Sequence, residues 1–408
     1  MFGTNKPKII TDEDIIEEIL TRGVEKVYPN KAAFKEVLMS GKEIRLYYGI
    51  DPTGSTLHLG HLVQLLKLRK FQDLGHEVII LIGDFTAQIG DPTDKQATRK
   101  PLTHQQVLEN AKGYKKQISK ILDLGKSNIR FVHNEKWTNK LTPEDLLELA
   151  SHFTVSNLLT RDMFQERIKA GREVYVHEFL YPIFQAYDAV TMEVDLQIGG
   201  NDQMFNMLAG RDLMKRKKNK EMFVLTTKLL IDPTGKKMGK TEDNMITLND
   251  SANDMFGKVM SWPDSMISLG FEMVTNISDE EIKSIQSEFE TGKSNPKEYK
   301  ITLAKEIVKI CHGKEAAQKA AETFINTFSK GEFPEDAQII NVSKEEKIMD
   351  ILVEKKVVES KSEFRRLVEA GAVSDYPDKK INDPNETVGE GERKIKIGKK
   401  TFVVLKSS

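Results

Sequence analysis

Hydrophobic and polar positions near the start of the chain follow a strand, helix, strand order. Residues 43–50, EIRLYYGI, alternate in polarity and then become wholly apolar, and residues 77–83, EVIILIG, have the pattern of a buried strand. Between them, residues 57–76 repeat Leu and Val at helical spacing, and the repeat stops at Gly75. Strand, helix and strand within this length form a βαβ unit, which predicts a parallel sheet covered by helices.

Helical spacing dominates further along the chain. Residues 105–175 are predicted to be mostly amphipathic helix, residues 195–200 a further strand, and residues 277–327 helical, with a capped helix beginning at Ser278. Residues 329–342 lose this periodicity and contain Gly and Pro, which is typical of a linker. The remaining residues predict a pair of short helices followed by a pair of strands.

The predicted elements divide the 408 residues into several domains. We predict an α/β fold with a Rossmann-like parallel-sheet domain over residues 1–225, which includes a helical insertion at about 105–175. A loop and an α-helical domain follow over residues 226–330. A linker over residues 331–342 then leads to a small α+β module over residues 343–408.

Composition narrows the class of protein. The 61 basic residues nearly balance the 62 acidic ones and 39% of the residues are hydrophobic, so neither disorder nor a strongly basic nucleic-acid coat is indicated. This balance still permits a local RNA site. The single Cys311 cannot form an internal disulfide, the start lacks the apolar stretch of a secretory signal, and the longest aliphatic run, VIILI at 78–82, is too short to span a bilayer. The sequence therefore predicts a soluble cytoplasmic protein with no membrane segment.

Residues 51–61, DPTGSTLHLGH, follow the first predicted strand and open the helix. A helix N-terminus presents unpaired amide hydrogens and partial positive charge, which favours phosphate oxygens as ligands. His58 and His61 lie three residues apart and share a face, so both imidazoles could donate to one polyphosphate, while Gly60 lets a flat base approach the backbone. The alternative is that one histidine caps a turn and the other is a packed core residue.

Residues 235–243, GKKMGKTED, gather Lys236, Lys237 and Lys240 around two glycines. Such a stretch suits a cationic loop that closes over phosphates. It does not match the P-loop pattern, which needs four residues between its glycines where this stretch has three. Taken alone, it could equally be a solvated lysine turn.

Residues 197–203, QIGGNDQ, end a predicted strand with two glycines and then Asp202. Glycine permits close approach to the backbone, and a carboxylate can accept hydrogen bonds from ribose hydroxyls. An ordinary Gly-Gly-Asn turn is the alternative interpretation.

Together these motifs resemble the class I aminoacyl-tRNA synthetases, with HLGH standing for the HIGH signature and KMGKT for the KMSKS signature. Within that class the chain is similar to the bacterial-type tyrosyl-tRNA synthetase family over almost its whole length. The stretches that carry this resemblance, in chain order, are YYGIDPTGSTLHLGH, IGDPTDKQATR, HEFLYPIFQAYD, IGGNDQ and KKMGKT.

The resemblance implies a two-step reaction. Tyrosine and ATP would give tyrosyl-adenylate and pyrophosphate, and the tyrosyl group would then pass to the terminal ribose of tRNA(Tyr). The attacking carboxylate is already ionised at neutral pH, so the first step needs positioning and charge stabilisation rather than a strong base. Mg²⁺ would arrive with ATP, and no metal site of the protein's own is expected. The α-helical domain would bind the anticodon, and the C-terminal module would bind RNA.

The resemblance also implies roles for single residues. The implied catalytic residues are Thr53, His58, His61, Lys95, Arg99, Lys237, Lys240 and Thr241. The implied ATP ligands are Gly49, Asp51, Gly60, Gly200, Asp202 and Lys240. The implied tyrosine ligands are Tyr47, Asp91, Tyr181, Gln185, Asp188 and Gln203.

Amino acid choice centres on the stretch YPIFQAYD. Tyr181, Gln185 and Asp188 stand at i, i+4 and i+7 of a predicted helix and share a face. That face could be a polar stripe in water, but the surrounding apolar residues favour partial burial. By resemblance, Asp188 and Tyr47 bond the phenol of tyrosine, and a buried pair of this kind would be left unsatisfied by phenylalanine.

Two further expectations concern partners. The stretch SKSEFRRLVEAGAV presents Lys361, Arg365 and Arg366 on one helix and resembles the start of a small RNA-binding module, although the acidic residues in the following SDYPD depart from the family pattern. A solvated charged helix is the alternative. A homodimer is expected through the insertion, where apolar residues gather: Phe153, Val155, Leu158 and Leu159.

Three other functions stay open at this stage. A tryptophan-specific relative would share the fold and the signatures. A small-molecule nucleotidyltransferase also uses HxGH at a helix start, but leaves the lysine loop and the C-terminal module without a role. A catalytically silent RNA-binding paralogue would be expected to lack some of the histidines and lysines that are present.

Overall fold

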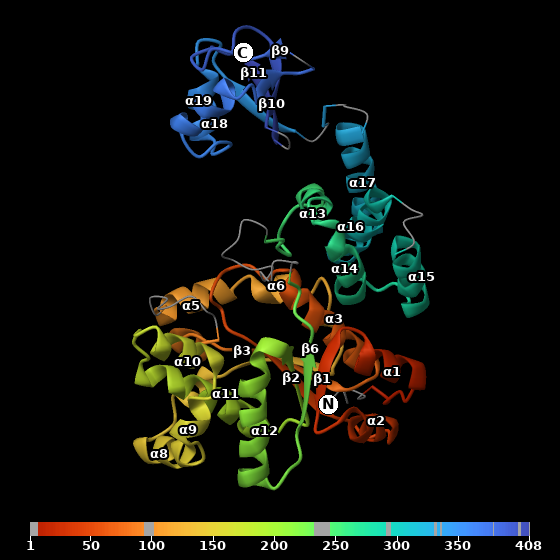
Figure 1. Ribbon diagram of the computed structural model, residues 1–408, viewed down its shortest axis with the longest axis vertical. Coiled ribbons are helices and arrows are strands. Elements are labelled where there is room, and N and C mark those ends of the chain that lie inside the picture. Colours follow the sequence, from red (N-terminus) through yellow and green to blue (C-terminus); the bar gives the residue numbers. More distant parts are fainter. Residues whose placement is uncertain are drawn as a thin grey trace, which may run out of the picture. The chain divides into compact units, whose positions relative to one another are not determined.

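The chain forms two compact units, residues 1–317 and residues 318–408 (Figure 1). The computed structural model describes residues 7–93, 102–231, 245–290, 295–329, 333–334, 337–377, 379–398 and 401–407. The domain limits predicted from the sequence remain predictions.

The first unit is built on a six-stranded sheet with the order β1-β6-β5-β2-β3-β4. Neighbouring strands from β6 to β4 run parallel, and β1 pairs antiparallel with β6 at the edge. The predicted parallel βαβ core is therefore confirmed. Its strands are β1 (Val24–Tyr28), β2 (Arg45–Ile50), β3 (Glu77–Ile82), β4 (Ile129–His133), β5 (Leu196–Gly200) and β6 (Phe223–Thr227).

Helices connect these strands and continue after the sheet. The capped helix expected after Ser278 is confirmed as α15, where the Ser278 hydroxyl accepts a hydrogen bond from the backbone N–H of Glu281. The helices are α1 (Glu13–Thr21), α2 (Lys31–Met39), α3 (Leu59–Asp73), α4 (Thr86–Ile89), α5 (His104–Ala111), α6 (Tyr114–Ile118), α7 (Glu135–Thr138), α8 (Pro143–Ser151), α9 (Val155–Leu158), α10 (Asp162–Lys169), α11 (Val176–Met192), α12 (Met204–Lys218), α13 (Ala252–Met260), α14 (Ile267–Val274), α15 (Asp279–Glu290), α16 (Pro296–His312) and α17 (Lys314–Ser329).

The helical prediction for residues 105–175 is wrong at one place. Residues 129–133, IRFVH, form β4, which pairs with β3 along its whole length. None of the five residues of β4 is fully buried, so the strand shows little periodicity, and the long helical stretches around it masked the signal. The insertion is therefore two helical segments separated by an edge strand of the main sheet.

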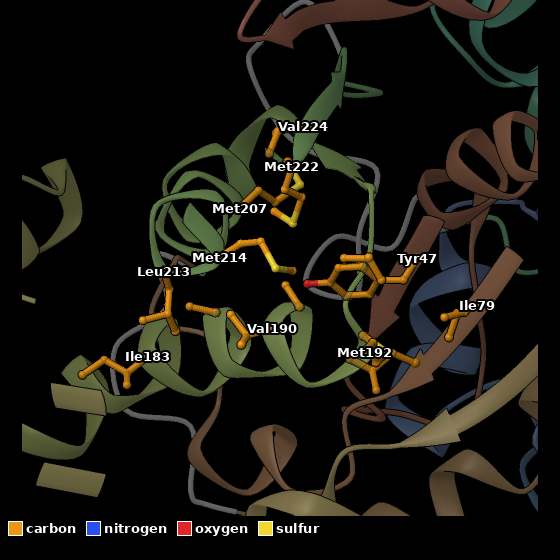
Figure 2. Packing of buried hydrophobic residues seen from close by; sticks show 14 of the residues in the cluster. Tyr47, Ile79, Ile183, Val190, Met192, Met207, Leu213, Met214, Met222 and Val224 are labelled. Atoms are coloured by element: carbon orange, nitrogen blue, oxygen red, sulfur yellow. The ribbon is translucent and has the colours of Figure 1, made fainter. Parts of the chain in front are cut away.

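The sheet is covered on both faces. Tyr47, Ile79 and Val224 face a hydrophobic cluster with α11 and α12, and Figure 2 shows Tyr47 reaching from β2 towards these helices. On the opposite face, the hydroxyl of Thr227 accepts a hydrogen bond from the side chain of Gln64 on α3 at 2.8 Å. This layering leaves the carboxyl ends of the parallel strands free to form a site.

The second unit holds a five-stranded sheet with the order β7-β11-β10-β8-β9. The predicted helix pair and strand pair are confirmed, but the predicted linker is wrong at residues 338–342, which form β7 and pair in parallel with β11. The run QIINV is too short for periodicity to separate a strand from a linker. The elements are β7 (Gln338–Val342), α18 (Ile348–Glu354), α19 (Lys361–Glu369), β8 (Val373–Asp375), β9 (Lys379–Lys380), β10 (Glu392–Ile397) and β11 (Thr401–Ser407). Across the described parts of both units, no helix is long and apolar enough to cross a membrane.

Candidate active site

A cavity of about 1100 Å³ lies at the carboxyl ends of β2, β3 and β5. Open parallel sheets bind their ligands at this edge. The predicted catalytic, tyrosine-binding and ATP-binding residues that the structure describes all line it: Tyr47, Gly49, Asp51, Thr53, His58, Gly60, His61, Asp91, Tyr181, Gln185, Asp188, Gly200, Asp202 and Gln203. The remaining predicted residues of this site fall outside the described parts of the chain: Lys95, Arg99, Lys237, Lys240 and Thr241.

His58 and His61 cap the N-terminus of α3 as a reciprocal pair. The Nδ1 of His58 accepts the backbone N–H of Gly60 at 3.1 Å, and the Nδ1 of His61 accepts the backbone N–H of His58 at 3.1 Å. Since each Nδ1 is an acceptor, the ring proton of a neutral imidazole sits on Nε2. A side chain at Gly60 would place Cβ 2.8 Å from the His58 ring, so the glycine allows this capping geometry. The caps therefore orient both rings and place the ring proton of each on Nε2.

Asp51 follows β2 and is held by two hydroxyl donors. Thr86 donates to Oδ1 at 2.7 Å and Tyr181 donates to Oδ2 at 2.8 Å. A Cβ on Gly83, just after β3, would lie 2.0 Å from Oδ1, so only glycine leaves room for this carboxylate. Burial raises the pKa of Asp51 to about 7, against the lowering effect of the two hydroxyl groups.

Asp188 on α11 is fully enclosed, with 1% of its surface exposed. Trp137 donates from Nε1 to Oδ1 at 2.7 Å and Asn134 donates from Nδ2 to Oδ2 at 3.1 Å. Burial raises the pKa of Asp188 to about 8. Tyr47 is also buried, and both its burial and the charge of Asp188 raise the pKa of its phenol well above the ordinary value. The Tyr47 hydroxyl has no hydrogen-bond partner within the described residues.

Asp91 lines the cavity from the turn after α4. Its Oδ1 accepts hydrogen bonds from the Thr93 N–H at 2.9 Å and the Thr93 hydroxyl at 2.7 Å, and its Oδ2 accepts one from the side chain of Gln203. Two amide oxygens of the cavity lining, those of Gln185 and Gln197, are buried without a partner in the described parts of the chain. The site thus offers an oriented carboxylate and spare acceptors to a cationic group.

Comparison with known proteins agrees with this arrangement. Residues 39–329 match the family described as tRNA synthetases class I (W and Y). The chain is 41% identical to the tyrosine–tRNA ligase of Thermotoga maritima, over 96% of this chain and 97% of that one, and 43% identical to the tyrosine–tRNA ligase of Desulfotalea psychrophila, over 90% and 91%. The chain belongs to the tyrosyl-tRNA synthetase family.

The synthetase fold is also found among solved structures. A C-terminally truncated mitochondrial tyrosyl-tRNA synthetase from Aspergillus nidulans superposes with a TM-score of 0.65, covering 78% of this chain and 95% of that one at 23% identity. At this identity the likeness concerns the fold, and it supports the Rossmann-like arrangement of sheet and helices.

Two segments that carry predicted residues of the synthetase site lie outside the described residues, and cavity residues stand next to each of them. Thr93 and Leu102 line the cavity on either side of residues 94–101. Lys228 to Leu230 line it ahead of residues 232–244, and on the far side of that segment Ile246 accepts the backbone N–H of Leu59 at 3.1 Å. The chain therefore enters and leaves each segment beside the histidine turn or the cavity.

Sequence reasoning missed several residues that position the synthetase site. Gly83 and Thr86 shape the Asp51 environment, while Asn134 and Trp137 hold Asp188. The latter two follow β4, which the helical prediction overlooked. The only signals in the sequence were the glycine directly after β3 and the asparagine directly after β4, and neither indicates which carboxylate it serves.

Proposed function

We propose that this cavity activates tyrosine with ATP and transfers it to tRNA(Tyr). The observation that carries the proposal is the buried pair of Tyr47 and Asp188. The hydroxyl of Tyr47 lacks a partner in the described chain, while the Asp188 carboxylate is fixed by Trp137 and Asn134. A substrate phenol can accept from Tyr47 and donate to Asp188. Phenylalanine would leave both groups buried and unsatisfied, which is costly.

The amino group of tyrosine would bind on the opposite side of the cavity. Asp91 supplies the negative charge, and the free oxygen of Gln185 and the phenolic oxygen of Tyr181 supply further acceptors. Gln203 holds the second carboxylate oxygen of Asp91 and so fixes its plane. Charge-assisted bonds of this kind are stronger than neutral ones, so they orient the substrate as well as bind it.

In the first step a carboxylate oxygen of tyrosine attacks the α-phosphorus of ATP, and pyrophosphate leaves. His58 and His61 would donate from Nε2 to the phosphates, together with the hydroxyl of Thr53, and Asp202 would bind the ribose. Gly49, Gly60 and Gly200 would let the nucleotide approach the backbone closely, and Asp51 completes the proposed ATP site. In the second step a ribose hydroxyl of the tRNA terminus attacks the acyl carbon, and AMP leaves.

Positive charge for the transition state would come from the two flanked segments. Lys95 and Arg99 lie in one, and Lys237, Lys240 and Thr241 lie in the other. The entry and exit of both segments beside the cavity support this proposal. Donors that engage mainly as charge develops raise turnover rather than ground-state affinity. Mg²⁺ would arrive with ATP and bind through its phosphates.

A homodimer through the insertion remains part of the proposal. Of the residues predicted for this contact, Val155 is 67% exposed but Leu158 is buried within the subunit, so Leu158 cannot form the surface. Other apolar side chains of the insertion and of the start of α11 are also exposed: Leu147, Ile168, Tyr175 and Val176. Large apolar side chains left exposed are a common feature of protein interfaces.

The C-terminal module is proposed to contact tRNA. Arg365 and Arg366 are exposed on α19, whereas Lys361 pairs with Asp350 at 2.7 Å. The acidic turn weakens the positive field less than the sequence suggests, because Asp375 forms an ion pair with Arg393 at 2.8 Å. This charge balance leaves the two arginines of α19 available to RNA phosphates. Because tRNA is the proposed substrate, we also propose that the protein is located in the cytoplasm.

Charging assays test the whole proposal. Transcripts of tRNA(Tyr) and tRNA(Trp) would be incubated with ATP and either labelled tyrosine or labelled tryptophan. We expect label on tRNA(Tyr) with tyrosine only. Charging of tRNA(Trp) with tryptophan would favour the tryptophan-specific alternative, and the absence of charging with both would favour a silent paralogue.

A further inference from the structure

Arg161, directly before α10, is a buried cation next to the proposed site. Its side chain is only 5% exposed, and its guanidinium lies 5.6 Å from the ring centre of Phe164 and 5.0 Å from that of Phe205. Burial lowers its pKa, whereas the charge of Asp91 raises it. Arginine nevertheless remains protonated in proteins. Its Nη1 is buried without a hydrogen-bond partner among the described residues.

The other terminal nitrogen of Arg161 reaches the turn that carries Asp91. Nη2 donates a hydrogen bond to the hydroxyl oxygen of Thr93 and lies 3.8 Å from Oδ1 of Asp91. Thr93 has a single hydroxyl proton, and that proton is donated to Asp91 at 2.7 Å. Thr93 must therefore accept from Arg161 while it donates to Asp91, and such a chain of hydrogen bonds polarises each member.

This arrangement sets Asp91 apart from the two neighbouring carboxylates. Within the described residues, Asp51 and Asp188 receive side-chain hydrogen bonds only from neutral donors. Among the residues that the structure describes, Asp91 is the one of the three that has an arginine behind its hydrogen-bonding partner. Replacing a whole buried ion pair by apolar side chains of similar volume is often neutral for stability, so stability alone does not explain why a cation is buried here. A carboxylate that binds an ammonium group must be held in one orientation, and the chain from Arg161 through Thr93 provides that hold.

We propose that Arg161 is a positioning residue for the substrate's ammonium group and acts through Thr93 on Asp91. The inference rests on the proposed role of Asp91 in tyrosine binding. Arg161 comes from the insertion, between the exposed Val155 and Ile168. A test must therefore separate its effect on the site from any effect on subunit association.

Substrate analogues provide that separation. Tyramine carries the phenol and the ammonium group, whereas 3-(4-hydroxyphenyl)propionate carries the phenol and the carboxylate without an ammonium group. We expect Arg161→Met and Thr93→Val to weaken binding of tyrosine and tyramine about tenfold, as for loss of one charge-assisted hydrogen bond. Binding of the propionate and the KM for ATP should stay unchanged. Arg161→Lys should recover part of the loss, since it keeps the charge.

The control is Arg216→Met. Arg216 also contacts the insertion, since it donates a hydrogen bond to the carbonyl of His152 at 2.9 Å, but it does not line the cavity. The affinity of this variant for each ligand should therefore equal that of the unaltered protein. Light scattering on each variant reports subunit association. Because Thr93 lies outside the insertion, Thr93→Val tests the hydrogen-bond chain to Asp91 without altering the insertion. Equal weakening of tyramine and the propionate, or no weakening of either, would overturn the inference. Failure of the unaltered protein to bind tyrosine would instead overturn the proposed function.

Discussion

At the scale of a single residue, the buried carboxylate of Asp188 makes the stability of the folded protein depend on pH. Its pKa of about 8 in the folded protein lies far above the ordinary value of 3.8. Between these values the folded protein holds a proton that the unfolded chain has released, so this group stabilises the fold at low pH and loses that contribution as the pH rises through about 8. The same enclosure suits Asp188 to its proposed role as the partner of a substrate phenol.

We expect Asp188→Asn to remove this pH dependence. Relative to the unaltered protein, the free energy of unfolding of the variant should rise between pH 4 and pH 9 by more than about 1.4 kcal/mol, the equivalent of one pKa unit. Denaturant titrations without ligand at both pH values measure the difference. Asp264→Asn, at an exposed ion pair, is the matched control. A constant difference across the pH range would contradict the assigned pKa.

Tyr47 allows a second prediction, because its hydroxyl is buried without a partner in the described chain. Removing an unsatisfied polar group does not sacrifice a hydrogen bond. Tyr47→Phe should therefore keep or raise the melting temperature of the free protein, yet weaken tyrosine binding by about 1 kcal/mol or more. Calorimetric titration and thermal unfolding measure the two effects. Lower stability with unchanged tyrosine affinity would show that the hydroxyl serves the fold instead of the substrate.

At the scale of elements, the start of α3 combines a structural cap with a proposed catalytic donor. His58 caps the helix through Nδ1 and would reach phosphate through Nε2. His58→Asn keeps a good cap but removes the donor, whereas His58→Ala removes both. We expect the adenylation rate to fall strongly in both variants, and the stability to fall by about 1 kcal/mol in the alanine variant alone. Rapid-quench kinetics and denaturant unfolding separate the roles; full activity of His58→Asn would exclude the phosphate role.

The helices and strands also show how much of the fold could be predicted from the sequence. Long stretches with a clear hydrophobic period, together with glycine and helix-capping residues at their ends, predicted the βαβ unit, the helix of Tyr181 and the capped helix after Ser278. Short edge strands, β1, β4 and β7, carry too few residues for a period to emerge, so their partners in the sheet decide their structure.

The site was predictable only in part for a similar reason. Motif residues such as His58 and Asp188 stand out in the sequence. Residues that act by holding them do not, because contacts such as those of Asn134 with Asp188, or of Arg161 with Thr93, join positions distant in the chain. Only the folded arrangement brings these pairs together.

At the scale of the whole molecule, the division into two units predicts a division of labour. Every described residue assigned to tyrosine or ATP belongs to the unit of residues 1–317. A truncation should begin at Gln338, since β7 pairs with β11 and would otherwise be left with an unpaired edge. Removal of residues 338–408 should spare tyrosyl-adenylate formation and impair tRNA charging, most strongly at high salt, where the remaining phosphate contacts weaken. A salt series of charging rates provides the check, and full charging by the truncated protein throughout would contradict the RNA role of the module.

The most direct test of the account is amino-acid-dependent exchange of labelled pyrophosphate into ATP, run with each of the twenty amino acids. The pairing of Tyr47 with Asp188 predicts exchange with tyrosine and none above background with phenylalanine or tryptophan. Exchange supported by tryptophan but not by tyrosine would contradict the proposed recognition of a phenol at this site.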